Sequence, residues 1–184
     1  MAITLFPDGR IQKNGVEIGT QEGGGLMNQR WCLTANFTNS SINSEDIVAA
    51  GFTKNSVSNA IYGTIENETM TTSTGVFTFP STGIYEIICK VMASRVTGDN
   101  KYVYWYTNIS TDSGSSYTMR EQGTTCMTNF SGTNTINIYS SLLIKVTNAT
   151  TTRVRFGMLV GKNTVTIMST ASGTSVTFKK ISEL

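Results

Sequence analysis

The stretch GVFTFPSTGIYEIICKV at residues 75–91 decides the fold class of this chain. At its start two aromatic residues alternate with smaller ones, as in a strand with one face in a core. A proline then ends that strand because it cannot donate to a β-ladder, and a glycine shortly after it allows a tight turn into the next strand. The stretch therefore predicts two strands that contribute to one core. Its core-motif positions are Phe77, Phe79, Pro80, Gly83 and Tyr85.

The composition of the whole chain favours the same fold class. Only 14% of the 184 residues are charged, against roughly 25% in typical globular domains. Thr, Ser, Asn and Gly are abundant, and these residues suit pleated strands and the turns between them. The length and the scarcity of proline indicate one domain with a short extension.

Strand-like segments recur along the chain with turn signals between them. A short run of this kind lies near residues 60–65, and residues 44–51 are predicted to form one helical turn with Ser44 as its N-cap and Gly51 at its end. About ten short strands without a long helix predict an all-β sandwich or barrel. The other predicted strands are 31–37, 75–79, 84–93, 102–109, 117–121, 125–130, 135–146, 153–160, 165–169 and 175–181.

The first 28 residues differ from the rest and are predicted to form an extended N-terminal arm, ahead of a main domain at residues 29–184. The dipeptide Asn14-Gly15 is preferred in two-residue type I′ turns and predicts a hairpin at residues 10–18. Three glycines at 23–25 indicate a hinge. Because an isolated hairpin is only marginally stable in water, we expect the arm to gain order on a partner surface. The candidate anchoring residues are Ile3, Leu5, Phe6, Ile11, Val16 and Ile18.

Several predicted strands carry apolar or aromatic residues on both faces. A single sandwich buries one face of each sheet, so the surplus apolar surface predicts a partner, and we expect a homotrimer. Tyrosine suits such an interface because it offers a large contact area with a polar tip. The alternative is that these rings cover the rim of the sheet in a monomer. The candidate interface residues are Tyr102, Tyr104, Tyr106, Tyr139, Ile84 and Ile88.

Few residues suited to catalysis or metal binding are present. The chain has no histidine, which removes the commonest general base and the commonest imidazole ligand. The acidic pairs Glu45/Asp46 and Glu66/Glu68 are interpreted as solvated, and Asp112 as part of a turn with Ser113 and Gly114. We therefore expect no enzymatic activity and no cofactor, and we assign no metal ligand. Cys32, Cys89 and Cys126 are interpreted as buried free thiols.

The charge pattern disfavours two classes of partner. A formal net charge of +2 without a run of Lys or Arg gives no electrostatic footprint for nucleic acid or for an anionic membrane. The first residues lack the features of a signal peptide, and no stretch reaches the ~18 apolar residues that a membrane span needs. We therefore expect synthesis in the cytoplasm.

Residues 75–91 resemble the most characteristic stretch of the complement globular-head and tumour-necrosis-factor-like jelly-roll family. In that family a Gly-x-Phe strand is followed by proline, a turn and Gly-hydrophobic-Tyr, and the core-motif positions match this pattern one by one. The resemblance covers about residues 29–184 and implies a ten-stranded jelly-roll sandwich. It also implies trimers packed around a threefold axis by an aromatic and aliphatic face.

The layout of the chain, with the arm MAITLFPDGRIQKNG, a glycine hinge and then such a jelly roll, resembles structural proteins of tailed bacteriophages. We therefore expect a virion protein that decorates and stabilises the capsid, with the major capsid protein or another virion protein as its partner. The alternative is a receptor-binding module at the tip of a tail or head fibre, which would recognise a host receptor through aromatic residues in exposed loops.

Overall fold

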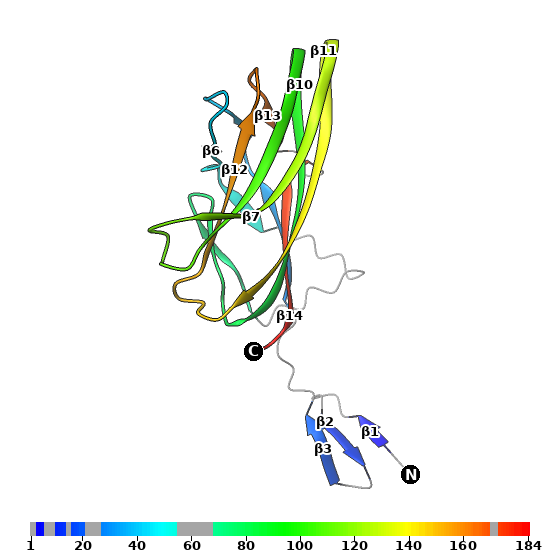
Figure 1. Cartoon of the computed structure of the whole chain (residues 1–184). Coiled ribbons are helices and arrows are strands. Elements are labelled where there is room, and N and C mark those ends of the chain that lie inside the picture. The colour runs from blue at the N-terminus through cyan, green and yellow to red at the C-terminus, as the bar shows by residue number, and fades with distance from the viewer. Residues whose placement is uncertain (1–2, 6–9, 14–15, 21–26, 55–67, 170–172) are drawn as a thin grey trace.

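The computed structural model describes residues 3–5, 10–13, 16–20, 27–54, 68–169 and 173–184 (Figure 1). This part of the chain is built from β-strands and contains no helix, which confirms the predicted all-β class. Consequently, it also contains no helix long and apolar enough to cross a membrane. The run predicted near residues 60–65 lies outside the described residues.

Within the residues that the structure describes, fourteen strands form two sheets, one of three strands and one of eleven. The strands are β1 (Ile3–Leu5), β2 (Arg10–Lys13), β3 (Val16–Thr20), β4 (Asn28–Leu33), β5 (Phe37–Thr38), β6 (Asp46–Ile47), β7 (Phe52–Lys54), β8 (Thr71–Ser73), β9 (Val76–Thr78), β10 (Gly83–Ser110), β11 (Thr118–Val146), β12 (Arg153–Val160), β13 (Thr166–Ile167) and β14 (Ser175–Ser182).

The two longest strands, β10 and β11, form one antiparallel ribbon that folds over from one layer of the molecule into the other. Their pairing runs from Gly83 opposite Val146 to Ile109 opposite Thr118. Register shifts begin after Arg95, where the ribbon bends (Figure 1). The sequence predicted the straight parts as separate strands, because period-2 alternation does not reveal that the hydrogen bonds continue through a bend.

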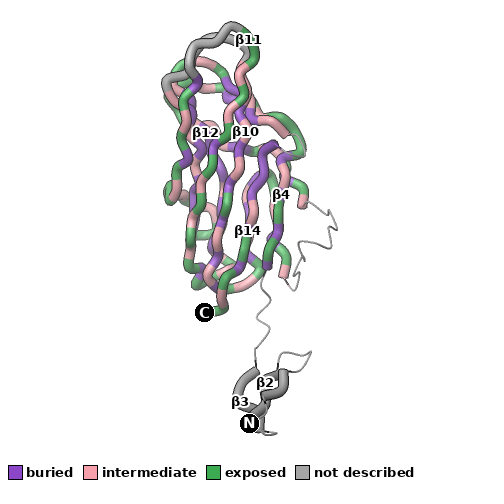
Figure 2. Tube along the Cα trace, turned by 90° about the vertical axis from the view of Figure 1, so that its right-hand side faces the viewer, coloured by how far each residue is buried: buried purple, intermediate pink, exposed green. Residues whose placement is uncertain are grey.

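The two halves of the ribbon belong to opposite layers of a sandwich. In layer one, residues 83–95 of β10 pair with β14, which continues to β4 and β7. In layer two, residues 102–110 of β10 pair with β12, which continues to β9 and β8. Figure 2 shows buried and exposed residues alternating along these strands, as expected when one face of each layer is covered. This antiparallel sandwich is the predicted jelly roll.

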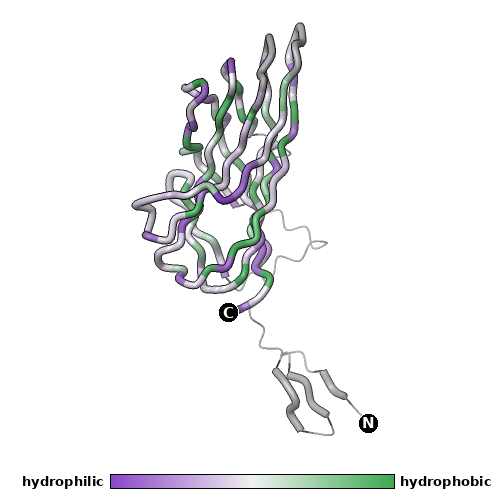
Figure 3. Tube along the Cα trace, in the orientation of Figure 1, coloured by the Kyte–Doolittle hydropathy of each residue, from purple (hydrophilic) through white to green (hydrophobic). Residues whose placement is uncertain are grey.

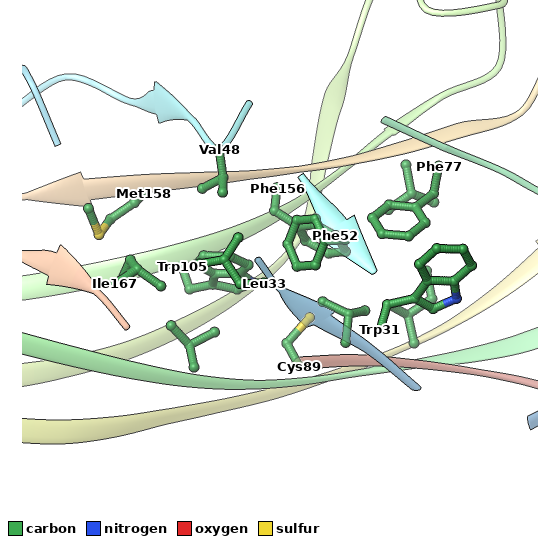
Figure 4. Packing of buried hydrophobic residues seen from close by; sticks show 14 of the residues in the cluster. Trp31, Leu33, Val48, Phe52, Phe77, Cys89, Trp105, Phe156, Met158 and Ile167 are labelled. Carbon is green, nitrogen blue, oxygen red and sulfur yellow. The ribbon is translucent and has the colours of Figure 1, made fainter. Parts of the chain in front are cut away.

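An aromatic cluster centred on Phe77 joins the two layers (Figure 4). The centroid of the Phe77 ring lies 4.8 Å from that of Phe178 in layer one and 5.9 Å from that of Phe156 in layer two. Trp31 meets the same ring edge to face at 5.5 Å, a geometry that aromatic quadrupoles favour. Of the other core-motif residues, Phe79 and Tyr85 are buried and pack on each other at 4.8 Å, while Pro80 is exposed.

The prediction of a helical turn at residues 44–51 was wrong. Asp46 and Ile47 instead form strand β6, opposite Met158 and Gly157 of β12. The Asp46 carboxylate accepts hydrogen bonds from the backbone N–H groups of Ser40 and Ser41, at 2.5 and 2.9 Å. The segment is therefore tied to the loop before it and to the edge of layer two, and these tertiary contacts override its weak helical pattern.

The three-stranded sheet contains the arm. Strand β2 pairs with β3 in a hairpin that brings Lys13 opposite Val16, so the register agrees with the predicted two-residue turn, whose residues lie outside the described part. Strand β1 adds to β2 with Leu5 opposite Ile11. Of the candidate anchoring residues, Phe6 lies outside the described residues, and the other five lie on these three strands.

Candidate functional site

The six residues predicted to form a subunit interface lie on the two opposite outer faces of the sandwich. Ile84 and Ile88 on β10 and Tyr139 on β11 lie on the outer face of layer one, because their chain neighbours Tyr85, Ile87 and Ile138 point into the core. The three tyrosines at 102, 104 and 106 alternate with buried Val103 and Trp105 on the half of β10 in layer two. The structure therefore separates the candidates into two surfaces.

The first surface, which we name the apolar face, consists of Ile84, Ile88, Tyr139, Leu143 and Ile181 on the outer side of layer one. Leu143 and Tyr139 are each 64% exposed and Ile88 is 37% exposed. Ile88 stands opposite Ser141, so Tyr139 and Leu143 are its diagonal neighbours on the adjacent strand. Figure 3 shows the hydropathy along these strands. Three large apolar side chains are thus exposed on the same face of layer one.

Charged residues also lie within the apolar face. Glu86 stands between Ile84 and Ile88 on β10 and opposite Leu143, and Lys90 stands opposite Tyr139. Lys179 lies opposite Glu86, and the Lys179 Nζ atom is 3.8 Å from a carboxylate oxygen of Glu86. Both side chains are partly exposed, so this ion pair contributes little to the stability of the chain. The apolar side chains of this face are therefore interspersed with charged groups that can pair across a subunit interface.

Strand β11 forms an edge of both layers. Within the described residues it pairs with β10 and with no other strand. Its other side therefore leaves backbone N–H and C=O groups without partners in the sheet, next to Tyr139 and Leu143. The apolar face and an open sheet edge thus adjoin each other.

The second surface, which we name the tyrosine ladder, consists of Tyr102, Tyr104 and Tyr106 on the outer side of layer two. The rings stack in order along β10, with centroids 4.9 Å apart for Tyr102 and Tyr104 and 5.9 Å apart for Tyr104 and Tyr106. The interplanar angles are 28° and 19°. Each ring is half-buried, so the ladder presents ring edges and hydroxyl groups rather than open ring faces.

Gly157 of β12 and Gly161, which directly follows that strand, make room beside the tyrosine ladder. A Cβ atom at Gly161 would lie 2.8 Å from the ring of Tyr102, and one at Gly157 would overlap the carboxylate of Glu45. That carboxylate accepts a hydrogen bond of 2.6 Å from the Asn108 amide. Glycine at these positions therefore lets large side chains lie flat on the sheet.

Comparison with solved structures gives the same fold. The structure of Eiger TNF from S. frugiperda superposes with a TM-score of 0.61 at 8% identity, over 87% of this chain and 95% of that one. Murine APRIL at pH 5.0 superposes with a TM-score of 0.59 at 10% identity, over 85% of this chain and 99% of that one. The protein has a tumour-necrosis-factor-like fold. No protein-family model and no curated protein matches the sequence.

Within this tumour-necrosis-factor-like fold, one buried cationic group was missed by the sequence analysis. Lys180 of β14 is 1% exposed, and its Nζ atom donates to Glu68 Oε2 at 3.1 Å, to Ser81 Oγ at 2.6 Å and to Glu183 Oε1 at 2.6 Å. Burial lowers the pKa of Lys180, but the hydrogen bonds to Glu183 and Glu68 outweigh it and raise the pKa above its ordinary value. Lys180 therefore stays charged and holds the end of β14 to two loops.

The acidic residues that were interpreted as solvated are in fact engaged where the structure describes them. Glu68 binds Lys180, Glu45 binds Asn108, and Asp46 caps the backbone at Ser40 and Ser41. Glu66 lies outside the described residues. Among the described residues no group of three or more Asp, Glu or Cys side chains is placed to hold a metal ion.

The Asp112 turn that joins β10 to β11 is held by its own hydrogen bonds. The Asp112 carboxylate accepts hydrogen bonds from the Ser110 hydroxyl at 2.6 Å and from the Ser116 backbone N–H at 3.0 Å. Hydrogen bonds from Ser110 and Ser116 hold the pKa of Asp112 well below its ordinary value. Ser113 and Gly114 follow with φ of 64° and 95°, as the turn requires.

All three cysteines are free, as predicted, but they differ in burial, and Cys32 is only partly buried rather than buried as predicted. Cys89 is buried between the layers, where desolvation raises the pKa of its thiol to about 11. Cys126 is exposed, so the prediction that it is buried was wrong. It belongs to the outer edge of layer two, and period-2 alternation alone does not indicate which side of an edge strand is covered.

Proposed function

We propose that this protein is a non-enzymatic structural component of a bacteriophage particle, a homotrimer that decorates the capsid. The observation that carries the proposal is the apolar face, where Ile88 and its diagonal neighbours Tyr139 and Leu143 are exposed in the single chain. Contiguous apolar patches on soluble proteins mark sites of interaction. Each such side chain contributes roughly 1–2 kcal/mol when a partner removes it from water.

The position of the apolar face next to the free edge of β11 supports a ring of three copies. Contact between the face of one subunit and the β11 edge of the next uses two different surfaces, and such heterologous contacts close into rings when the rotation fits. The family resemblance of residues 75–91 implies a threefold ring. Tyr139 and Leu143 would lie in its centre, and the tyrosine ladder would remain on its outer side.

The N-terminal arm supports attachment to a larger assembly. Its three strands form a sheet of their own and, among the described residues, pair with no strand of the sandwich. Three arms on one trimer bind cooperatively, because docking of the first arm makes docking of the others effectively intramolecular. A protein that binds only the assembled shell stabilises it in proportion to RT ln(1 + [L]/Kd).

Two measurements test the proposal. Sedimentation equilibrium is expected to return three times the chain mass of 20.0 kDa, and a stable single chain at micromolar concentration would remove the basis for the trimer. Quantitative mass spectrometry of purified particles is expected to find hundreds of copies on the shell. A handful of copies confined to the tail would instead support the receptor-binding alternative.

A further inference from the structure

The tyrosine ladder and the apolar face differ in chemistry, so they suit different partners. Four of the exposed large apolar side chains belong to the apolar face: Ile88, Tyr139, Leu143 and Ile181. None of the ladder tyrosines is exposed to that degree. They stack on one another, and each is half-buried. The apolar face suits another protein surface, whereas the ladder suits an occupant that forms hydrogen bonds.

The ladder is ordered before any partner binds. Stacking fixes each ring against the next, and the Tyr102 hydroxyl donates to Asn43 Oδ1 at 2.7 Å. Asn43 has a φ of 58°, a conformation that asparagine tolerates. Because the side chains are already held, binding orders little that was free, and this lowers the entropic cost of association.

Polar groups repeat along the ladder at the spacing of the strand. Tyr104 lies opposite Thr124, and Tyr106 lies opposite Gln122 on β11. Thr124 and Gln122 are exposed. A phenol hydroxyl and an amide can each donate and accept. The surface therefore presents two successive pairs of donor–acceptor groups.

The charge of this surface determines the class of ligand. The Glu45 carboxylate lies over Gly157, the residue opposite Tyr106, and so disfavours an anionic ligand there. The Arg155 guanidinium lies 3.9 Å from the centroid of the Tyr117 ring. The ladder itself consists of neutral groups that both donate and accept. Anionic ligands are recognised by clusters of Arg and Lys, whereas a neutral saccharide carries many hydroxyls that also donate and accept. Charge and hydrogen-bonding pattern thus match a neutral saccharide.

We propose that the tyrosine ladder, together with Gln122 and Thr124, is a binding site for a neutral saccharide. The ring edges pack against the apolar C–H groups of the sugar, while the hydroxyls of Tyr104 and Tyr106 and the side chains opposite them bind its hydroxyl groups. This role goes beyond decoration of a capsid and does not depend on it, since the ladder lies on the layer opposite to the apolar face.

Affinity electrophoresis of the full chain tests the site. Native gels would contain amylopectin, hydroxyethyl cellulose or dextran as neutral probes, or heparin as an anionic probe. We expect retardation by at least one neutral polysaccharide. The double variant Tyr104→Phe/Tyr106→Phe keeps the rings but removes two hydroxyls, and its affinity should fall by about five- to tenfold or more. Tyr139→Phe makes the same chemical change on the apolar face and should bind like the wild type.

Three results would overturn the proposal. These are no retardation by any neutral probe, retardation by heparin alone, or equal binding by the double variant and by Tyr139→Phe. Circular dichroism and thermal unfolding verify that both variants fold. Their solution masses are measured in the same samples, so that failure of saccharide binding is distinguished from failure of the trimer.

Discussion

The ammonium group of Lys180 donates a hydrogen bond of 2.6 Å to Oγ of Ser81, and that hydroxyl lies 2.7 Å from Glu68 Oε2. Ser81 also accepts at its backbone carbonyl from the Tyr85 hydroxyl, at 3.0 Å. The loop after β9 and the last strand are thus joined by one polar network at the end of the core. Such a network stabilises the fold only while every member keeps its partners.

Lys180→Met should therefore destabilise the fold, because it leaves Glu68 and Ser81 without their cation. We expect a loss of roughly 2 kcal/mol in the free energy of unfolding. This is less than the 3–5 kcal/mol typical of a fully buried pair, since Glu68 and Glu183 remain 24% and 48% exposed. Urea denaturation measures this loss in the free energy of unfolding. The matched variant is Lys179→Met, because Lys179 is 52% exposed and lies 3.8 Å from Glu86. It should change the free energy of unfolding by under about 0.5 kcal/mol. Equal losses in the two variants would contradict the stabilising role of the Lys180 network.

Stability should fall in alkaline solution through the Cys89 thiol. Its pKa rises from 9.0 to about 11 on folding, so between these values the unfolded chain has lost a proton that the folded chain retains. The stability that Cys89 contributes is therefore complete below pH 9 and is lost as the pH rises toward 11, with a slope of at most about 1.4 kcal/mol per pH unit. Urea midpoints from pH 8 to 11 should fall less steeply in Cys89→Ala. If the urea midpoints of the wild type and of Cys89→Ala fell equally with pH, the Cys89 thiol would not be the cause.

The hairpin between β8 and β9 should respond in opposite directions to two substitutions. Thr74 and Gly75 have φ of 49° and 78°, and Ser73 pairs with Val76, which is the geometry of a type I′ turn. Thr74→Asn should stabilise the fold by about 0.5–1 kcal/mol, because a β-branched residue is strained there. Gly75→Ala should cost more than about 2 kcal/mol, since its Cβ would lie 2.3 Å from the Val48 carbonyl oxygen.

Thermal unfolding provides the measurement for the hairpin variants. Thr71→Asn, in the extended strand β8, is the matched control and should not stabilise the chain. A gain at Thr71 as large as that at Thr74 would mean that the backbone conformation is not the cause.

Charge on the apolar face should dissociate the proposed trimer. Ile88→Asp and Leu143→Asp each place a carboxylate where the interface would exclude water, and the dissociation constant should rise at least about 100-fold. Analytical ultracentrifugation detects the change as a shift toward a single chain. Ile42→Asp alters a side chain outside that face whose exposure, 48%, lies between those of Ile88 and Leu143, and it should leave the mass unchanged. A trimer that survives both substitutions would place the interface elsewhere.

The fold class and most strands could be predicted because the signals are local. Residues 84–93 alternate with period 2, and Pro80 and Gly83 end one strand and start the next. The division of the interface candidates between two faces could not be predicted in this way. Alternation shows that Ile84 and Ile88 share one side of their segment and that the tyrosines share one side of theirs, but the bend of β10 after Arg95 carries the two segments into opposite layers.

The polar network illustrates a signal that was present but outweighed. Lys180 follows Val176 and Phe178 at period 2, which places it on the core side of β14. Two adjacent lysines near a chain end are usually solvated, and a sequence alone does not show that Glu68 and Glu183 lie within reach. Likewise, Asp46 was expected in a helical turn because the sequence does not reveal its bonds to Ser40 and Ser41.

We expect the pairing of β10 with β11 to determine the order in which these strands form during folding. The seven residues at 111–117 close a hairpin from which pairing can extend outward, first at Ile109 and Thr118 and last at Gly83 and Val146. Each new pair then adds to an already closed loop, and this avoids most of the entropy that distant contacts lose. We expect substitutions beside the Asp112 turn to slow refolding, whereas substitutions near Gly83 should mainly accelerate unfolding.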